Sequence, residues 1–295
     1  MSALREQSLS GHAHLEVVTT LLQRIRRAHP TAGLWEAADR QWSWRTPRSS
    51  DELPQLFWFD DDDAPAAAVI ITDSAQGVAF DPMFMPGTTA EQVAHIVERA
   101  LAHAAEHSID EVDLEVDRDD DVLREVLFAH GFTVRETGAV EAWLQADSRP
   151  GISSIPTGYR LSTRADSSDG PHHMTNAKRN HADVEARLRQ TSLYRPDLDL
   201  VVYDRQGDIA AYGLFWHDPT TATGLVEPMR TEDDHQRRGL ARHVLTAGVD
   251  LLASAGADRI KIVYDPDNPA SGHLYRSVGF EPHRHTDLLA GPTSR

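Results

Sequence analysis

The chain has 295 residues, 40% of them hydrophobic, and this length and composition suit two globular domains. Its formal net charge of −17 argues against nucleic acid or an anionic membrane as a main partner, since both require a basic surface. The absence of cysteine excludes disulfides, thiolate catalysis and cysteine-ligated zinc. We see neither a secretory signal nor an apolar stretch of about 20 residues, so we expect a cytoplasmic protein.

The first half of the chain alternates helical and extended patterns. The expected elements are a helix at 12–28, a connecting segment at 35–47, strands at 57–59 and 67–71, a helix at 90–106, and strands at 110–117 and 138–145. Serine, proline and glycine then gather at 148–157, which we expect to be a linker.

The second half continues with the same mixture of strands and helices. The expected elements are strands at 159–162, 198–204, 209–216 and 224–230, helices at 175–191, from 240 onward and at 269–277, a strand at 258–264, and a short final strand. This order favours an α/β (α+β) fold in which a mixed, splayed central sheet is flanked by helices.

An internal repeat indicates that this fold occurs twice. The strand pattern of 110–117 matches that of 258–265, and the match continues without a gap to Gly131-Phe132 and Gly279-Phe280, at a constant shift of 148 residues. We therefore expect two tandem domains of one kind, at 1–147 and 158–295.

The stretch from Gln236 to Ala241 is the most informative in the chain, because it lies where a strand ends and a helix begins. A glycine at 239 lets a ligand approach the backbone, and the first turn of a helix binds anions. Arg237 and Arg238 add positive charge. These parts suit a pyrophosphate. The first copy has Glu91 and no glycine here, so we expect it to hold no cofactor.

A second motif follows about thirty residues later, with Asn268, Tyr275 and the pair Gly279-Phe280 at fixed spacing. Together, the two motifs resemble those of the GCN5-related N-acetyltransferase (GNAT) superfamily. The tandem arrangement, with a degenerate first copy, looks like that of the two-domain actinobacterial acetyltransferases, of which mycothiol synthase is one.

The resemblance implies that acetyl-CoA binds to the second domain. The main chain near Met229 and Thr231 would hold the pantetheine arm, and the N–H groups from Arg237 to Arg242 would hold the pyrophosphate. The implied cofactor-binding set is Met229, Thr231, Gln236, Arg237, Arg238, Gly239, Leu240, Ala241, Arg242 and Asn268. Asn268 before Pro269 also suits an N-cap, and the two roles are compatible.

The resemblance also implies catalytic roles. Tyr275 would protonate the departing CoA thiolate, and Glu227 would act as the general base towards the acceptor. Water or a histidine in the region of His172, His173 and His181 is the alternative base. No ligand pattern for a metal appears in the sequence.

The leading functional hypothesis is an acetyl-CoA-dependent N-acetyltransferase that transfers the acetyl group to a primary amine by direct attack, with a small-molecule acceptor favoured. An inactive acyl-CoA-binding sensor or interaction module is the alternative. The sequence leaves open whether the protein is a monomer or a homodimer.

Overall fold

The computed structural model describes residues 4–74, 77–167, 170–175 and 180–294, which form two compact units. Unit 1 comprises Met1–Arg40, Pro47–Ala139 and Arg284–Arg295, and unit 2 comprises Gln41–Thr46 and Val140–His283. Among the described residues, no helix combines the length and the apolar composition needed to cross a membrane.

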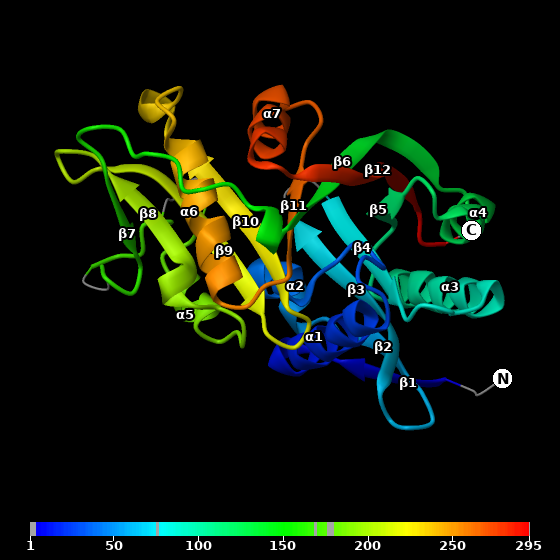
Figure 1. Cartoon of the computed structure of the whole chain (residues 1–295). Coiled ribbons are helices and arrows are strands. Elements are labelled where there is room, and N and C mark those ends of the chain that lie inside the picture. The colour runs from blue at the N-terminus through cyan, green and yellow to red at the C-terminus, as the bar shows by residue number, and fades with distance from the viewer. Residues whose placement is uncertain (1–3, 75–76, 168–169, 176–179, 295) are drawn as a thin grey trace. The chain divides into compact units, whose positions relative to one another are not determined.

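Unit 1 contains a mixed sheet covered by helices (Figure 1). Its strands follow the order β1 (Arg5–Leu9), β2 (Gln55–Phe59), β3 (Pro65–Ser74), β4 (Gly77–Phe84), β5 (Glu111–Asp117) and β12 (Glu281–Pro292). Neighbouring strands are antiparallel except for β4 and β5, which are parallel. The helical elements are α1 (Gly11–Ala28), the first residues of α2 (Ala37–Ser43), η1 (Ser49–Glu52), α3 (Ala90–Glu106) and α4 (Asp121–Ala129); α2 continues into unit 2 from Gln41.

Helix α3 shows how the sequence builds this core. Val93, Ile96, Val97, Ala100 and Leu101 recur at helical spacing and are buried in one cluster with the apolar side chains of β3 to β5. The helix begins after a capping box, in which the Thr89 side chain accepts from the Gln92 N–H and Gln92 reaches back to Thr89.

Unit 2 contains a second mixed sheet. Its strands follow the order β7 (Arg160–Thr163), β8 (Asp199–Tyr203), β9 (Ile209–Asp218), β10 (Thr223–Thr231), β11 (Arg259–Tyr264) and β6 (Thr133–Gln145). The parallel pair is β10 and β11. The helical elements are η2 (Ala146–Ser148), α5 (Val184–Leu188), η3 (Pro196–Leu198), η4 (Asp233–His235), α6 (Leu240–Ser254) and α7 (Pro269–Val278).

The repeat seen in the sequence recurs in the structure. Helix α4 after β5 corresponds to α7 after β11, and Asp120 and Asn268 cap these helices through their side chains. Both helices are followed by a glycine in the left-handed region, Gly131 with φ +86° and Gly279 with φ +104°. The expected α/β fold with two related units is therefore confirmed.

The last strand of each repeat, however, pairs with a strand of the other repeat. Strand β6 follows α4 but pairs with β11 through residues 140–145, whereas β12 follows α7 but pairs with β5. The bounds of the compact units consequently differ from the consecutive segments 1–147 and 158–295. The expected short final strand is the 12-residue β12.

Two other expected segments also differ. Residues 148–157, expected as a linker, lie within unit 2, where Arg149 pairs with Asp250 at 2.8 Å and the Ser153 N–H donates to Thr246 Oγ1 at 3.0 Å. The helix expected at 175–191 is reduced to the five residues of α5, while 176–179 lie outside the described residues.

Helix α6 lies along β8, β9 and β10 in Figure 1, and Gly248 permits this close approach. A Cβ at 248 would lie 2.1 Å from Cζ of the buried Phe215 on β9. The absence of a side chain on the helix therefore gives the ring its space.

We predict that Gly248→Ala lowers the free energy of unfolding by about 1–3 kcal/mol, because the added methyl group must displace Phe215. Chemical denaturation followed by circular dichroism measures this change. Gly151→Ala is the matched control, since no atom lies within 4 Å of its new Cβ. Equal stability of the two variants would contradict the packing argument.

Candidate active site

The candidate site in unit 2 begins where β10 leaves its parallel neighbour. Thr223 to Val226 pair with β11, and the pairing then ends, while β10 continues along β9 as far as Thr231. The register with β9 shifts between Val226 and Met229, so a bulge lies at Glu227-Pro228. Trp216 on β9 fixes this bulge, because its Nε1–H donates to the Glu227 carbonyl oxygen at 2.8 Å.

The peptide groups of the freed segment alternate in direction, as in any strand. The Glu232 N–H donates to the Ala210 oxygen at 2.9 Å, on the side of β9. Every second residue back from Glu232 points the same way. The main-chain N–H and C=O groups of Thr231 and Met229 therefore point away from β9, towards the side on which β11 no longer pairs. These are the two residues whose main chain the sequence motif singled out.

Helix α6 begins directly after this strand and its connecting loop. Gly239 is its N-cap, with φ +83°, and no side chain caps the helix. The first hydrogen bond of the helix runs from the His243 N–H to the Gly239 carbonyl oxygen at 3.1 Å. The N–H groups of Leu240, Ala241 and Arg242 have no acceptor within the helix, as the geometry of a first turn requires. Open space surrounds the position of a Gly239 Cβ, so a ligand has room there.

Most polar side chains of the loop support its shape. Gln236 donates to Asp233 at 3.1 Å, and Arg238 donates to the Asp234 carbonyl at 3.0 Å. Arg242 joins α6 to α7 by donating to Ser277 Oγ at 2.6 Å. Arg237 is exposed, has φ +61°, and makes no ion pair or hydrogen bond with a side chain among the described residues. Of the two arginines singled out in the motif, Arg237 therefore has the side chain available to an anion.

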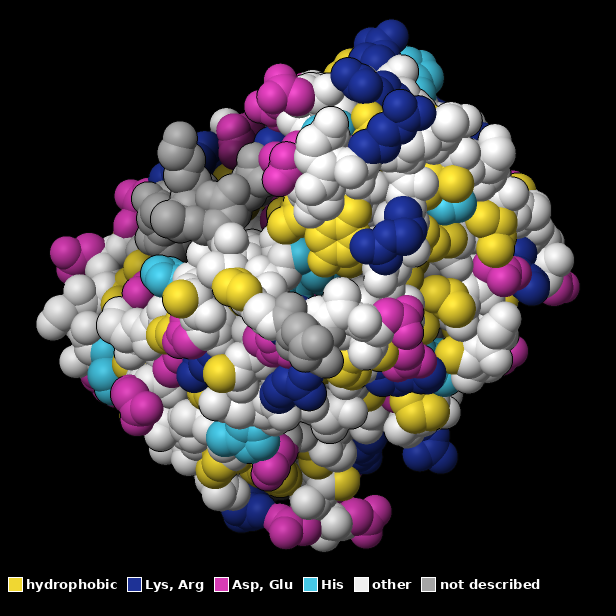
Figure 2. Space-filling view, turned by 90° about the vertical axis from the view of Figure 1, so that its left-hand side faces the viewer, with side chains coloured by type: hydrophobic (Ala, Val, Ile, Leu, Met, Phe, Trp, Pro, Cys, Tyr) yellow, Lys and Arg dark blue, Asp and Glu magenta, His cyan; other side chains and the backbone are white. Residues whose placement is uncertain are grey.

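Basic side chains are visible as a local group on a surface with many acidic ones. Figure 2 shows Lys and Arg side chains gathered at the top of the face presented, at the height of the loop before α6 and of α7 in Figure 1. In the sequence, Arg237 and Arg238 belong to the loop before α6, Arg242 to the first turn of α6, and Arg276 to α7. Local positive charge of this kind favours an anionic ligand in a chain of net charge −17.

Tyr275 lies half-buried on α7, with its ring 5.5 Å from that of Tyr264 and 6.3 Å from that of Phe280. Burial, together with the negative charge of Glu227, raises the pKa of the Tyr275 hydroxyl to about 12. The hydroxyl is therefore a neutral hydrogen-bond donor throughout the physiological range.

Asn268 performs the capping role that the sequence allowed. Its Oδ1 accepts from the Ser271 N–H at 3.4 Å, and Pro269 occupies the first turn of α7. The side chain is exposed, so the cap does not prevent contact with a ligand. Its contact with a cofactor stays a prediction.

Tyr159 is a supporting residue that the sequence motifs do not include. Its hydroxyl lies 3.1 Å from Arg238 Nη1 and 3.1 Å from His235 Nδ1, so it accepts from the arginine and can donate to the histidine. It connects the start of β7 with the loop before α6. No local signal identifies it, because its partners lie more than seventy residues away in the sequence.

A buried polar cluster lies close to the strands of the site. Asp199 Oδ2 accepts from Tyr194 at 2.9 Å and lies 2.8 Å from His172 Nε2, while Asp199 Oδ1 lies 2.9 Å from His173 Nε2. Despite the burial of the carboxyl group, these neighbours hold the pKa of Asp199 down at about 2. The Tyr194 ring lies 6.3 Å from that of Trp216, which fixes the bulge.

The donor atoms of His172, His173 and Asp199 lie within 4.8 Å of one another, so we tested whether they fit a metal ion. His172 Nδ1 accepts from the Met174 N–H at 3.2 Å, which places the proton of a neutral ring on Nε2. A metal at Nε2 would require that proton on Nδ1 instead. The geometry of His172 therefore favours a hydrogen bond to Asp199, which ties this histidine to β8. His173 Nε2 lies near Asp199 Oδ1 without forming a well-aligned hydrogen bond. Because both histidines are buried against Asp199, an acceptor has less access to them than to Glu227.

Comparisons with known proteins concern the family and the fold. The Acetyltransferase (GNAT) family matches residues 164–280. Mycothiol acetyltransferase of Clavibacter michiganensis subsp. michiganensis is 28% identical over 147 residues, which are 46% of this chain and 47% of the relative, so this alignment spans about half of it. Mycothiol acetyltransferase of Clavibacter sepedonicus is 25% identical over 74% of each chain.

A solved structure extends the likeness to the whole chain. The tandem GNAT protein from the clavulanic acid biosynthesis pathway has a TM-score of 0.70, with 99% of both chains covered. At 14% identity this likeness concerns the fold.

The low pKa of Asp199 predicts how acid affects stability. Its ordinary value is 3.8, so the ionised carboxylate stabilises the fold above about pH 4, and this contribution is lost as the pH falls towards 2. The shift corresponds to about 2 kcal/mol. We expect wild type to exceed Asp199→Asn in unfolding free energy at pH 6, and we expect the difference to shrink by about this amount at pH 2. Denaturant titrations measure both values. A pH-independent difference would contradict the assignment.

Proposed function

Because the chain is a tandem member of the GNAT acetyltransferase superfamily, we propose that it is an acetyl-CoA-dependent N-acetyltransferase with a single working site, in unit 2. The observation that carries the proposal is the convergence of three features. They are the freed main chain of Met229 and Thr231, the uncapped first turn of α6, and the half-buried hydroxyl donor Tyr275 on α7.

The three features match the chemical parts of acetyl-CoA. The N–H groups of Leu240, Ala241 and Arg242 would hold the pyrophosphate, with Arg237 as an additional cation. The freed peptide groups of β10 would bind the pantetheine amides, whose hydrogen-bonding needs resemble those of a strand. One main-chain N–H near Met229 would donate to the thioester carbonyl and stabilise the charge that develops on its oxygen.

In this proposal, the amine nitrogen of the acceptor attacks the thioester carbon and the carbon–sulfur bond breaks. Glu227 takes the proton released by the nitrogen, directly or through water. Tyr275 donates to the departing sulfur. A phenol of pKa about 12 is a weaker acid than a thiol of about 8.5, so Tyr275 stabilises the thiolate mainly by a hydrogen bond. A direct transfer of this kind needs no enzyme nucleophile, which suits a chain without cysteine.

The acceptor is proposed to be a small molecule with a primary amine. The relatives named mycothiol acetyltransferase support a small-molecule acceptor, although at 25–28% identity they do not identify which one. The acidic surface favours the approach of a cationic amine.

We predict that Tyr275→Phe lowers kcat at least tenfold, because the departing thiolate loses its hydrogen-bond donor, while the Kd for acetyl-CoA changes less than twofold. Release of CoA thiol is measured with a thiol reagent across a panel of primary amines, and the absence of cysteine keeps the background low. Tyr203→Phe on β8 is the matched control.

Undiminished turnover in Tyr275→Phe would contradict its assigned role. Binding of acetyl-CoA without CoA release for any amine would instead favour an acyl-CoA-binding module without transferase activity.

A further inference from the structure

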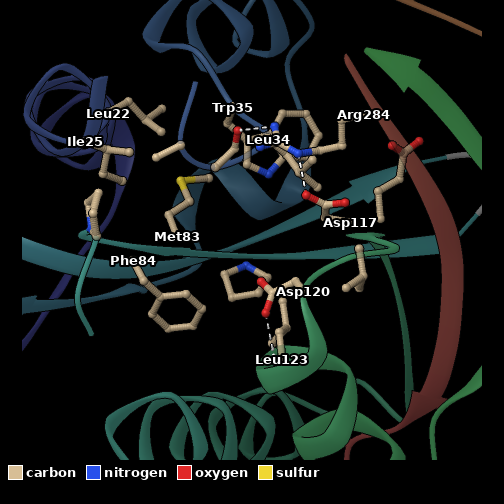
Figure 3. Close-up of a pocket in the computed structure, with 16 residues that line it drawn as sticks. Leu22, Ile25, Leu34, Trp35, Met83, Phe84, Asp117, Asp120, Leu123 and Arg284 are labelled. Carbon is tan, nitrogen blue, oxygen red and sulfur yellow. Dashed lines mark hydrogen bonds and ion pairs between the residues drawn. The ribbon is translucent and has the colours of Figure 1, made fainter. Parts of the chain in front are cut away.

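Unit 1 has a partly open cavity of about 210 Å³ between α1, β4, β5 and α4. Figure 3 shows its walls, with Leu22 and Ile25 from α1 and Met83 and Phe84 from β4. The polar end carries Glu115, Asp117, Asp120 and Arg284, and Glu115 accepts from Thr286 Oγ1 at 3.0 Å. The remaining wall is largely apolar. All of these residues belong to unit 1.

The cavity occupies the place in unit 1 that the candidate cleft occupies in unit 2. Met83 corresponds to Met229 in the repeat, and Asp120 corresponds to Asn268. Strands β4 and β5 pair at Ala79 and Asp113 and leave one another further along, as β10 and β11 do. Unit 1 has therefore kept an opening between its two parallel strands.

The surroundings of this opening no longer suit a pyrophosphate. In the first turn of α3 the Gln92 N–H already donates to the Thr89 side chain, and Glu91 adds a negative charge there. Strand β4 also pairs with β3 without a register shift from Gly77 to Phe84, so it has no bulge like that of β10. A ligand of this cavity is consequently expected to lack phosphate groups.

The polar end of the cavity has acceptor capacity that the protein does not use. Arg284 is occupied by Asp117 and by the carbonyls of Thr31 and Gly33. Asp120 Oδ1 accepts from the Leu123 N–H at 3.0 Å, as Figure 3 shows, whereas Oδ2 accepts no hydrogen bond from the described residues. Since Arg284 already neutralises Asp117, the charge of Asp120 is left for a cation.

We propose that this cavity binds a small organic ammonium ion, with its apolar body between Leu22, Ile25 and Met83 and its ammonium group at Asp120 Oδ2. The size agrees, because an apolar cavity of about 150 Å³ accommodates benzene, and the larger volume here leaves room for an aminoalkyl chain. This site lies in unit 1 alone and does not depend on acetyl transfer by unit 2.

The test uses the full chain and 4-fluorophenethylamine, followed by fluorine NMR at pH 7. We expect saturable binding of the amine at this site, and at least tenfold weaker binding of the neutral analogue 2-(4-fluorophenyl)ethanol. Met83→Trp should abolish this binding by filling the cavity. Asp120→Asn should weaken it at least tenfold, because the charged acceptor is lost.

Asp120→Asn also keeps the fold, since asparagine caps a helix as well as aspartate does and stands at the equivalent position 268. Asp119→Asn, an exposed neighbour with the same charge change, is the matched control and should bind as wild type does. Absence of saturable amine binding in wild type would overturn the proposal. Binding that is indifferent to both Met83→Trp and Asp120→Asn would also overturn it, because the amine would then bind elsewhere, as at an acceptor site in unit 2.

Discussion

The parting of β10 from β11 after Val226 is the constraint on which the rest of the candidate site depends. Two parallel strands that stay paired use their facing peptide groups on each other. Where the strands separate, the peptide groups of Met229 and Thr231 are available for a ligand. The bulge, to which Trp216 donates a hydrogen bond, allows β10 to stay paired with β9 beyond this point. The same strand then leads into the loop and the uncapped turn of α6, so one element delivers both the main-chain donors and the anion site.

The two units show how few local changes distinguish the helix end proposed to bind pyrophosphate from one that carries a side-chain cap. In unit 2, Gly239 adopts a positive φ and provides no side-chain cap, so the first turn of α6 stays open. In unit 1, the Thr89 side chain accepts from the Gln92 N–H, and the Gln92 side chain accepts from the Thr89 N–H. Because an N–H group that bonds to a cap is not available to a ligand, we propose that the capping box and Glu91 together disfavour an anion at this turn and leave the fold unchanged.

Much of this arrangement follows from local sequence. The apolar spacing of 90–106 predicts α3, and the glycines and asparagine of the two motifs predict the ends of α6 and α7. The exchange of β6 and β12 is not predictable in this way, because alternation assigns a strand's faces but not its partner. Tyr159 and the cluster of Asp199 with Tyr194 were likewise missed, since their roles arise only when distant segments meet.

A calorimetric titration of the full chain with acetyl-CoA is the decisive experiment for the proposed site. We expect one site per chain, lost in Gly239→Glu, because a carboxylate would then face the pyrophosphate. Gly207→Glu should bind normally, as this exposed turn glycine has a similar φ of +88° and the same open surroundings. Two sites would contradict the closure of unit 1, and binding that survives Gly239→Glu, or no binding at all, would contradict the assignment of unit 2.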